Sequence, residues 1–392
     1  MELEVYQDRQ ILKDAVKNFI QRDYSEGMIG QLVLHRESLS EFNHQLSNLD
    51  ITGICFPEKY GGVNLGPVET AIVVEELSRY AIDLGMALGL NLAAGMMVLR
   101  YGNESQKNHY LPGLISGEMT ACIAYTEPFS LGDVDNINHR IVEENEHLMI
   151  NTDAIYCEQR ELSKGILLIP AKQGGEIVFA LIPLTCMKAG EPVDLLGRKI
   201  LGQIKYGPQE IRCGAAHLFG QGHAMVTDLM NWLKFFNTVC CVGNMRTVVE
   251  KAIQYAKERE QFGKPIGTFQ AIQHLLVDAK IGLDCASLYG RWLAWLLTEN
   301  DNDSLPITAE INMANAYVTE AYVNAVNTGM QVMGGFGYME ESHMERYARD
   351  ARMTTYAVED GFSQKMRVAD ALQQTQVHAT MKRKGDQHAL SF

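Results

Sequence analysis

Two adjacent carboxylates near the C-terminal end of the chain are its clearest candidates for acid–base chemistry. Glu359 and Asp360 lie directly before Gly361. A carboxylate can remove a proton that lies within hydrogen-bond reach, in a site dry enough to raise the pKa of the acid. Two acids at a turn are also a common arrangement at the N-terminus of a helix. The two residues by themselves leave both roles open.

A cation and a pair of glycines point to an anionic ligand. Arg259 lies beside a turn that contains Gly263, where a guanidinium can make a bidentate contact with a pyrophosphate. Gly334-Gly335 allows backbone amides to approach an anion or an adenine closely. Both features suit a dinucleotide, although tight packing at a helix end would also explain the two glycines.

The cysteines and histidines show no pattern that favours a metal. The chain has 8 Cys and 11 His, without a CxxC pair and without His at zinc spacing. We therefore expect the cysteines to be small buried hydrophobes, and we assign no histidine a catalytic role.

Composition and charge exclude several classes of protein. The chain has 392 residues, 46% of them apolar, which is enough to bury a large core and excludes disorder. Lys plus Arg number 34 against 48 Asp plus Glu, a net charge of −14, so nucleic acid is not an expected partner. No apolar stretch approaches the roughly 18 uncharged residues of a membrane span, and the first residues lack the pattern of a signal peptide. We expect a cytoplasmic protein.

Hydrophobic periodicity divides the chain into three segments, which predict an α+β fold. Residues 1–120 show helical spacing, interrupted by a turn at 56–62 where Pro57, Gly61 and Gly62 break the pattern. Residues 121–225 contain short β-rich runs at 147–150, 166–169 and 177–182, the last two joined by a predicted hairpin at 173–176, which favours a small barrel or sandwich. Residues 226–392 return to long helical stripes and predict a bundle.

Specific strings fall at the joints of this pattern. They are Phe56-Pro57-Glu58-Lys59-Tyr60-Gly61-Gly62, Tyr125-Thr126-Glu127-Pro128, Arg259-Glu260-Gln261-Phe262-Gly263-Lys264-Pro265-Ile266, and Gln331-Val332-Met333-Gly334-Gly335-Phe336-Gly337-Tyr338 leading into Glu345-Arg346-Tyr347-Ala348-Arg349-Asp350-Ala351-Arg352. In this order and spacing they resemble the acyl-CoA dehydrogenase flavoproteins over nearly the whole chain. The resemblance implies an N-terminal helical domain, a middle β-barrel and a C-terminal four-helix bundle, in agreement with the pattern of periodicity.

The resemblance also implies FAD as the cofactor and a set of residues that bind it. The matching positions are Tyr125, Thr126, Gly132, Tyr156, Glu158, Arg259, Gln261, Phe262, Gln270, Gln331, Gly334, Gly335, Phe362 and Gln364. In the family, the sites that match Arg259 and Gly334-Gly335 come from different subunits and share one FAD, which implies a homodimer or homotetramer. Gly132 and Lys234 match positions near the bound substrate.

Two flavin strings depart from the family pattern. The family usually has Gly-Ala-Gly-Ser-Asp after Thr-Glu-Pro, whereas this chain has Phe129-Ser130-Leu131-Gly132-Asp133, without two of the glycines and with the serine moved. The usual Trp-Ile-Thr-Asn matches Tyr156-Cys157-Glu158-Gln159, so a carboxylate replaces the threonine donor. An anionic Glu158 near the flavin would disfavour a reduced, anionic flavin unless it is protonated or turned away.

The catalytic base is the least regular of these matches. The family commonly has Glu in a Tyr-Glu-Gly-Thr-Ser string, and alignment of Gly361 and Ser363 with that string places Asp360 at the base position, with Glu359 as second choice. Counting from Arg349-Asp350 without a gap gives Val358, which cannot act. A second position that the family uses matches Leu233, before Lys234, and offers no acid.

The resulting hypothesis is an FAD-dependent oxidoreductase that dehydrogenates an acyl thioester of coenzyme A or of a carrier protein, as in fatty acid metabolism. The base would take the α-proton, the β-hydride would pass to the flavin, and electron-transfer flavoprotein would accept the electrons. Because the strings at 129–132 and 156–159 are changed, two alternatives stay open: a non-catalytic or flavin-poor partner subunit, and a flavin-dependent oxygenase on the same scaffold.

Overall fold

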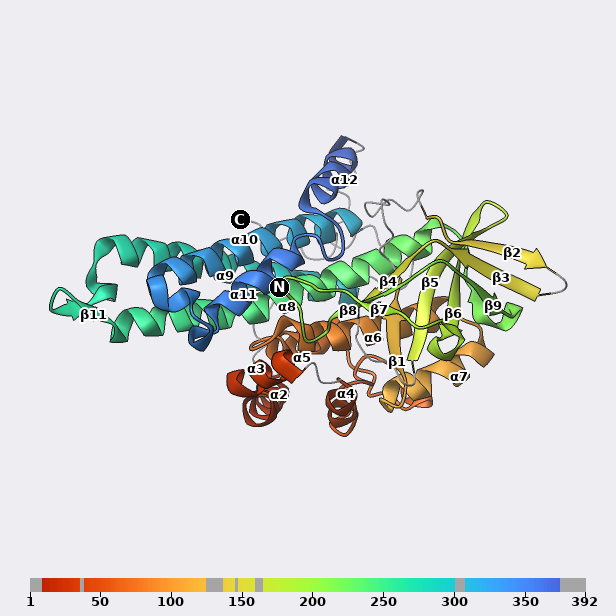
Figure 1. Cartoon of the computed structure of the whole chain (residues 1–392), viewed down its shortest axis with the longest axis horizontal. Helices are drawn as coiled ribbons and strands as arrows, with labels where there is room; N and C mark the ends of the chain where they lie inside the picture. Colours follow the sequence, from red (N-terminus) through yellow and green to blue (C-terminus); the bar gives the residue numbers. More distant parts are fainter. Residues whose placement is uncertain are drawn as a thin grey trace, which may run out of the picture.

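The computed structural model describes residues 9–35, 39–124, 137–144, 147–158, 165–299 and 307–373. In these ranges helices come first, a β-rich segment follows, and helices return (Figure 1). The last helix of the first segment ends at Ile115, β1 begins at Thr120, and α8 begins at His223 after β10.

The first segment is helical. Its helices are α2 (Gln10–Asp23), α3 (Glu26–His35), α4 (Ser40–Ser47), α5 (Pro67–Leu77), α6 (Ile82–Tyr101) and α7 (Glu104–Ile115), with the 3-10 turn η1 (Glu58–Tyr60) in the predicted break. Local signals start two of them. Pro67 opens α5, where the Glu69 carboxylate accepts a hydrogen bond from Gly66 N–H, and Asn103 caps α7 by accepting one from Gln106 N–H.

Helix α6 lies at the centre of the molecule. It packs against α5, α7, α8 and β1, so it is apolar around nearly its whole circumference. By length and composition it is the one helix of the described ranges that could cross a membrane, which the sequence pattern did not lead us to expect. However, 89% of its most apolar window is buried inside the molecule, as in the core helix of a globular fold.

The middle segment is a curled β-domain. Its strands are β1 (Thr120–Ile123), β2 (Arg140–Glu144), β3 (His147–Thr152), β4 (Ile155–Glu158), β5 (Gly165–Gln173), β6 (Glu176–Pro183), β7 (Glu191–Pro192), β8 (Gln203–Tyr206), β9 (Gln209–Cys213) and β10 (Leu218–Phe219). One sheet has the order β10-β6-β5-β2-β3-β9 with β1 parallel to β5, and the other has the order β4-β8-β7. A separate apolar cluster that includes Ile150, Ile155 and Leu167 fills the interior. This arrangement confirms the predicted β-domain.

The hairpin between β5 and β6 is also confirmed. Gln173 pairs with Glu176, and the two residues between them, Gly174 and Gly175, have φ of +59° and +94°. Glycine adopts such angles without a steric penalty, and a two-residue turn with positive φ at both positions matches the twist of the flanking strands.

The third segment is a bundle of long helices. Its elements are α8 (His223–Glu258), the two-stranded hairpin β11 (Glu260–Gln261) and β12 (Lys264–Pro265), the 3-10 turn η5 (Ile266–Thr268), α9 (Gln270–Glu299), α10 (Thr308–Met333), the 3-10 turns η6 (Gly334–Tyr338) and η7 (Glu340–Ser342), α11 (Met344–Thr354) and α12 (Gly361–Gln373). Helix α8 packs against α5, α6, α9 and α10 and joins the bundle to the N-terminal helices. The hairpin β11–β12 lies at the far end of the bundle from the β-domain (Figure 1).

Candidate functional site

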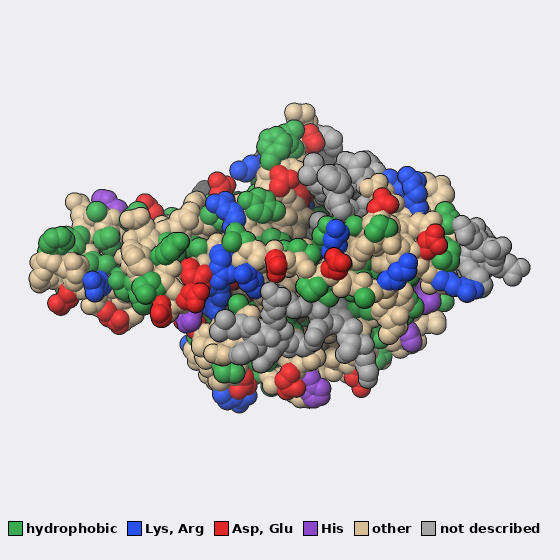
Figure 2. All heavy atoms as spheres, in the orientation of Figure 1, with side chains coloured by type: hydrophobic (Ala, Val, Ile, Leu, Met, Phe, Trp, Pro, Cys, Tyr) green, Lys and Arg blue, Asp and Glu red, His purple; other side chains and the backbone are tan. Residues whose placement is uncertain are grey.

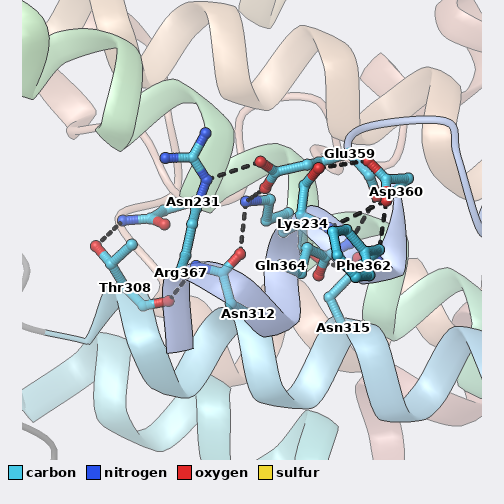
Figure 3. Close-up of polar contacts among 11 residues, drawn as sticks. Asn231, Lys234, Thr308, Asn312, Asn315, Glu359, Asp360, Phe362, Gln364 and Arg367 are labelled. Atoms are coloured by element: carbon cyan, nitrogen blue, oxygen red, sulfur yellow. Dashed lines mark hydrogen bonds and ion pairs between the residues drawn. The ribbon is translucent and has the colours of Figure 1, made fainter. Parts of the chain in front are cut away.

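The turn between α11 and α12 holds both predicted acids, but it places them in different environments. Glu359 is 4% exposed and Lys234 is 2% exposed, so their carboxylate and ammonium groups meet in the core. Lys234 Nζ donates a hydrogen bond to Glu359 Oε2 and another, of 2.7 Å, to Asn312 Oδ1. Arg367 Nε lies 2.7 Å from the other carboxylate oxygen, Glu359 Oε1 (Figure 3). Both oxygens of Glu359 are therefore held by cations.

The environment of Lys234 has opposing effects on its charge. Burial lowers the pKa of the Lys234 ammonium, and the adjacent Glu359 carboxylate acts in the opposite direction. The side chain that matched a substrate position is thus directed toward α10 and the turn before α12. Its contact with substrate stays a prediction.

Asp360 caps helix α12. Its Oδ1 accepts hydrogen bonds from Phe362 N–H at 2.9 Å and Ser363 N–H at 3.0 Å, and its Oδ2 accepts one from Ser363 Oγ at 2.6 Å. Although burial acts to raise it, these hydrogen bonds together lower the pKa of Asp360. The N-cap arrangement that the sequence left open is therefore present, and it fixes the direction of the carboxylate.

Two residues of the first turn of α12 lie beside Glu359 and Asp360. Gln364 is buried, and its Nε2 donates to the Glu359 carbonyl oxygen at 2.6 Å, which ties the helix to the turn. Phe362 is 74% exposed, so its ring is available to a ligand or to a neighbouring subunit. Both are predicted flavin contacts, and both lie beside the candidate base.

A second group of predicted flavin residues gathers at the far end of the bundle. Arg259 follows α8 directly, and its carbonyl oxygen accepts a hydrogen bond of 2.8 Å from Ile266 N–H across the β11–β12 hairpin. Arg259 is exposed, and so are three other predicted flavin residues: Gln261 and Phe262 of the hairpin, and Gln270 at the start of α9.

Gln331, Gly334 and Gly335 lie at this same end of the bundle. Tyr255 of α8 and Phe336 of η6 stack with ring centroids 5.7 Å apart, which brings the end of α10 beside the end of α8. An added Cβ at Gly334 or Gly335 would meet no atom within 4 Å, so close packing explains neither glycine. Gly334 ends α10 with a φ of +57°, so the end of the helix by itself favours glycine there, whereas Gly335 has no such requirement. Their open backbone and the nearby guanidinium of Arg259 fit the phosphate and adenine parts of a dinucleotide.

The structure changes one expectation about how these residues are shared. We expected the sites of Arg259 and of Gly334-Gly335 to come from different subunits, but in one chain they are neighbours. The set that lies apart is Tyr156 and Glu158 on β4. Arg198, the ion-pair partner of Glu158, lies 3.7 Å from Asp83 of α6, and two residues further along α6 an added Cβ at Gly85 would lie 3.0 Å from Cys240 Sγ of α8. Cys240 and Arg259 are about 28 Å apart at 1.5 Å per helical residue, so the two sets lie far apart in one chain.

The carboxylate that replaces the family's threonine is turned into the protein. Arg198 Nη2 lies 2.8 Å from Glu158 Oε2, and Nη1 lies 3.3 Å from Oε1, so the pair is bidentate and buried. Tyr156, two residues earlier on β4, is half-buried, with Lys205 Nζ 5.9 Å from its ring centroid. Tyr125, Thr126 and Gly132 lie outside the described residues.

The sequence reasoning missed Arg198, Asn312 and Arg367. None of these residues belongs to a recognisable string, and Arg198 is 40 residues from its partner Glu158. Arg367 lies eight residues after Glu359, beyond the spacings of three or four residues that pair side chains on a helix, so no local signal points to it.

Family models match two long parts of the chain. The acyl-CoA dehydrogenase N-terminal domain matches residues 7–118, and the acyl-CoA dehydrogenase C-terminal domain matches residues 220–372. Among curated proteins, the chain is 28% identical over 368 residues to a probable acyl-CoA dehydrogenase, YngJ, of Bacillus subtilis, covering 90% of this chain and 94% of that protein. It is also 28% identical over 345 residues to mitochondrial isovaleryl-CoA dehydrogenase of Pongo abelii, covering 85% of this chain and 80% of that protein.

Solved structures agree with this fold. The glutaryl-coenzyme A dehydrogenase glutaryl-CoA complex has a TM-score of 0.89 and 23% identity, over 99% of this chain and 100% of that chain. The prolyl acyl carrier protein oxidase AnaB has a TM-score of 0.83 and 24% identity, over 93% and 98% of the two chains. The chain therefore belongs to the acyl-CoA dehydrogenase family, a family of FAD-dependent oxidoreductases that act on CH–CH bonds.

Proposed function

We propose that this protein dehydrogenates an acyl thioester between its α and β carbons, with Asp360 as the base that takes the α-proton. The acyl group is carried by coenzyme A or by a carrier protein. Bound FAD supplies the acceptor for the β-hydride. The observation that carries the proposal is the turn before α12, where one acid is fixed in the core and the next is directed outward beside an exposed ring.

Asp360 suits the role of base better than Glu359. Both oxygens of Glu359 are engaged by Lys234 and Arg367, and removing them from these cations would leave buried charges unpaired. Asp360 is only half-buried and lies next to Phe362 at the surface of α12. Glu359 therefore stays the second choice.

The hydrogen bonds of Asp360 leave room for a proton. An ionised carboxylate offers about four lone-pair sites. Backbone N–H groups use two of them on Oδ1, and the Ser363 hydroxyl uses one on Oδ2. Asp360 is ionised at neutral pH, but its lowered pKa makes it a weaker base in this structure than the raised pKa expected for the role. A bound thioester that excludes water would strengthen it as a base.

The proposed FAD contacts require two subunits. Arg259, Gln331, Gly334 and Gly335 of one subunit would hold the phosphate and adenine parts, and Tyr156 and Phe362 of another would lie at the ring. Support comes from the separation of these sets in one chain and from apolar residues of α9 that are exposed: Val277, Ile281, Leu288 and Trp295. Figure 2 shows apolar side chains at the surface of the arm that the long helices form. A homodimer or homotetramer follows from this proposal.

The carrier and the electron acceptor are separate parts of the proposal. The solved relatives include a glutaryl-coenzyme A dehydrogenase in complex with glutaryl-CoA and a prolyl acyl carrier protein oxidase, so both carriers have precedent on this fold. We propose electron-transfer flavoprotein as the acceptor and the cytoplasm as the location.

Anaerobic flavin bleaching tests the proposal. The purified chain is assayed for FAD and then mixed, without oxygen, with acyl-CoAs of several lengths and with matching acyl carrier proteins. We expect loss of the oxidised flavin absorbance with one of these series. A chain that never retains FAD would instead be a partner subunit. A chain that holds FAD but is bleached by no thioester would favour the oxygenase alternative.

A further inference from the structure

Arg198 is buried where all three segments of the chain meet. It lies in the loop between β7 and β8, is 2% exposed, and faces three carboxylates from three other elements. These are Asp83 in the first turn of α6, Glu158 at the end of β4 and Asp350 in α11. A buried guanidinium among acids from three elements needs an explanation beyond packing.

The contacts of Arg198 are divided among the three acids. Its guanidinium makes the bidentate pair with Glu158, at 2.8 Å and 3.3 Å, and its Nε lies 3.7 Å from Asp83 Oδ1. Its backbone N–H donates to Asp350 Oδ1 at 2.6 Å. Arg346 and Arg349 of α11 also act on the Asp350 charge. Among the described residues, Arg198 is the cation whose guanidinium pairs with Glu158.

The backbone of Arg198 has an unfavourable conformation at the position from which its side chain pairs with Glu158. Its φ is +53°, in the left-handed region that residues with a Cβ rarely adopt. The preceding Gly197 lies so close to α11 that an added Cβ would be 2.3 Å from the Arg349 carbonyl oxygen. Such conformations persist only where the surroundings impose them, and they are common at functional sites.

The pair lies at the adjacent ends of β1 and β4, next in sequence to strings that match flavin contacts of the family. Cys122 Sγ of β1 donates to the Glu158 carbonyl oxygen at 3.4 Å, so the ends of β1 and β4 are adjacent. After β1 and Ala124 the sequence continues with Tyr125 and Thr126, and Glu158 occupies the position where the resemblance implies a threonine that donates to the flavin. An uncompensated carboxylate at this place would oppose the negative charge of a reduced flavin.

We propose that Arg198 is a positioning residue for the flavin site: it turns Glu158 away from the isoalloxazine ring and neutralises it, and so sets the reduction potential of the bound FAD. The proposal rests on FAD binding by this family. It does not depend on the thioester substrate, because its test needs none. A failure of the proposed dehydrogenase activity and a failure of this proposal are therefore distinguishable.

A double-mutant cycle on the FAD-loaded full chain tests the pair. The midpoint potential of the flavin is measured by spectroelectrochemical titration for the native chain and for R198Q, E158Q and R198Q/E158Q. We expect R198Q to lower the potential, because a positive charge beside the Glu158 carboxylate is lost, and E158Q to raise it, because a negative charge near the flavin is lost. A tenfold change in the relative affinity for reduced and oxidised FAD corresponds to about 30 mV for two electrons. The double variant should return toward the native potential.

A matched control separates a local charge effect from a general loss of stability. Arg246 and Glu75 form a half-buried ion pair between α8 and α5, with a distance of 2.5 Å and no residue of the β-domain. Arg246→Gln should leave the potential unchanged. If R198Q does not fold or loses FAD, the upward shift in E158Q decides alone. The proposal is overturned if the potentials of E158Q and R198Q equal the native value or shift in the same direction. The ion pair would then only hold the domains together.

Discussion

Lys234 of α8 and Glu359 of the turn before α12 form a buried ion pair although 125 residues separate them in the chain. Arg367 and Asn312 complete the set of partners (Figure 3). The pair fixes the turn from inside, so that Asp360, the next residue, is directed to the surface.

Substitution at Glu359 should mainly affect stability. Glu359→Gln leaves the Lys234 ammonium buried without its anion, which costs about 3–5 kcal/mol in the free energy of unfolding. Urea denaturation checks it, with Lys365→Gln as control, since Lys365 pairs with Glu320 on the surface. Equal stability of Glu359→Gln and the native chain would contradict the buried pair.

Substitutions at Asp360 should separate its cap from its chemistry. Asp360→Asn keeps an oxygen that accepts the Phe362 and Ser363 N–H groups, so the free energy of unfolding should change by under about 1 kcal/mol. Reduction of the flavin by substrate should fall at least about 100-fold, since a general base typically contributes that much. Asp360→Ala should lose both the cap, about 1 kcal/mol, and the reduction. Wild-type reduction rates in Asp360→Asn, measured by stopped-flow absorbance, would rule Asp360 out as base.

Arg259→Ala should weaken the retention of FAD. A charge-assisted contact to the pyrophosphate is worth about 1.5–3 kcal/mol, so the dissociation constant should rise roughly tenfold to 100-fold. Titration of the apoprotein with FAD measures it. Lys264→Ala, on the same exposed hairpin, is the control. If Arg259→Ala keeps the native affinity for FAD and the native assembly, Arg259 is not a contact of the pyrophosphate.

Charges on the exposed face of α9 should disrupt assembly. Ile281 and Leu288 are exposed in one chain, and Ile281→Asp/Leu288→Asp would place two carboxylates in the proposed interface. Sedimentation should shift toward a monomer of about 44 kDa, with loss of FAD because the composite site is broken. Lys280→Ala, which affects only a surface pair with Asp284, should sediment as the native protein does. A native monomer with full FAD content would contradict the shared site.

The stability of the fold should depend on pH through Asp83. Burial raises the pKa of this carboxyl to about 7, with a further rise from Asp350 and an opposing effect of Arg198. A carboxyl whose pKa is higher in the folded state stabilises the fold at low pH, and this contribution is lost as pH rises through about 7. Asp83→Asn should therefore gain a few kcal/mol relative to the native chain between about pH 4 and 8, at roughly 1.4 kcal/mol per pKa unit. Denaturation of both chains across this range measures the difference, and parallel curves would refute it.

The local pattern of the sequence was sufficient for the three-part fold. Apolar spacing records which face of each element is buried, and it separated the helical segments from the β-domain. Gly174 and Gly175 defined a hairpin because their positive φ is available to few other residues. The strings around Arg259 and Gly334 identified the family because they combine residue types with fixed spacing.

The tertiary structure alone decided what the charged residues do. Local sequence could not tell which of two adjacent acids faces the core: Glu359 meets Lys234 and Arg367 there, whereas Asp360 caps a helix. It also could not show that Glu158 is paired with Arg198, because the two residues come from different elements. Periodicity reports burial within one element, whereas the charge state and direction of a buried side chain depend on which distant segments pack against it.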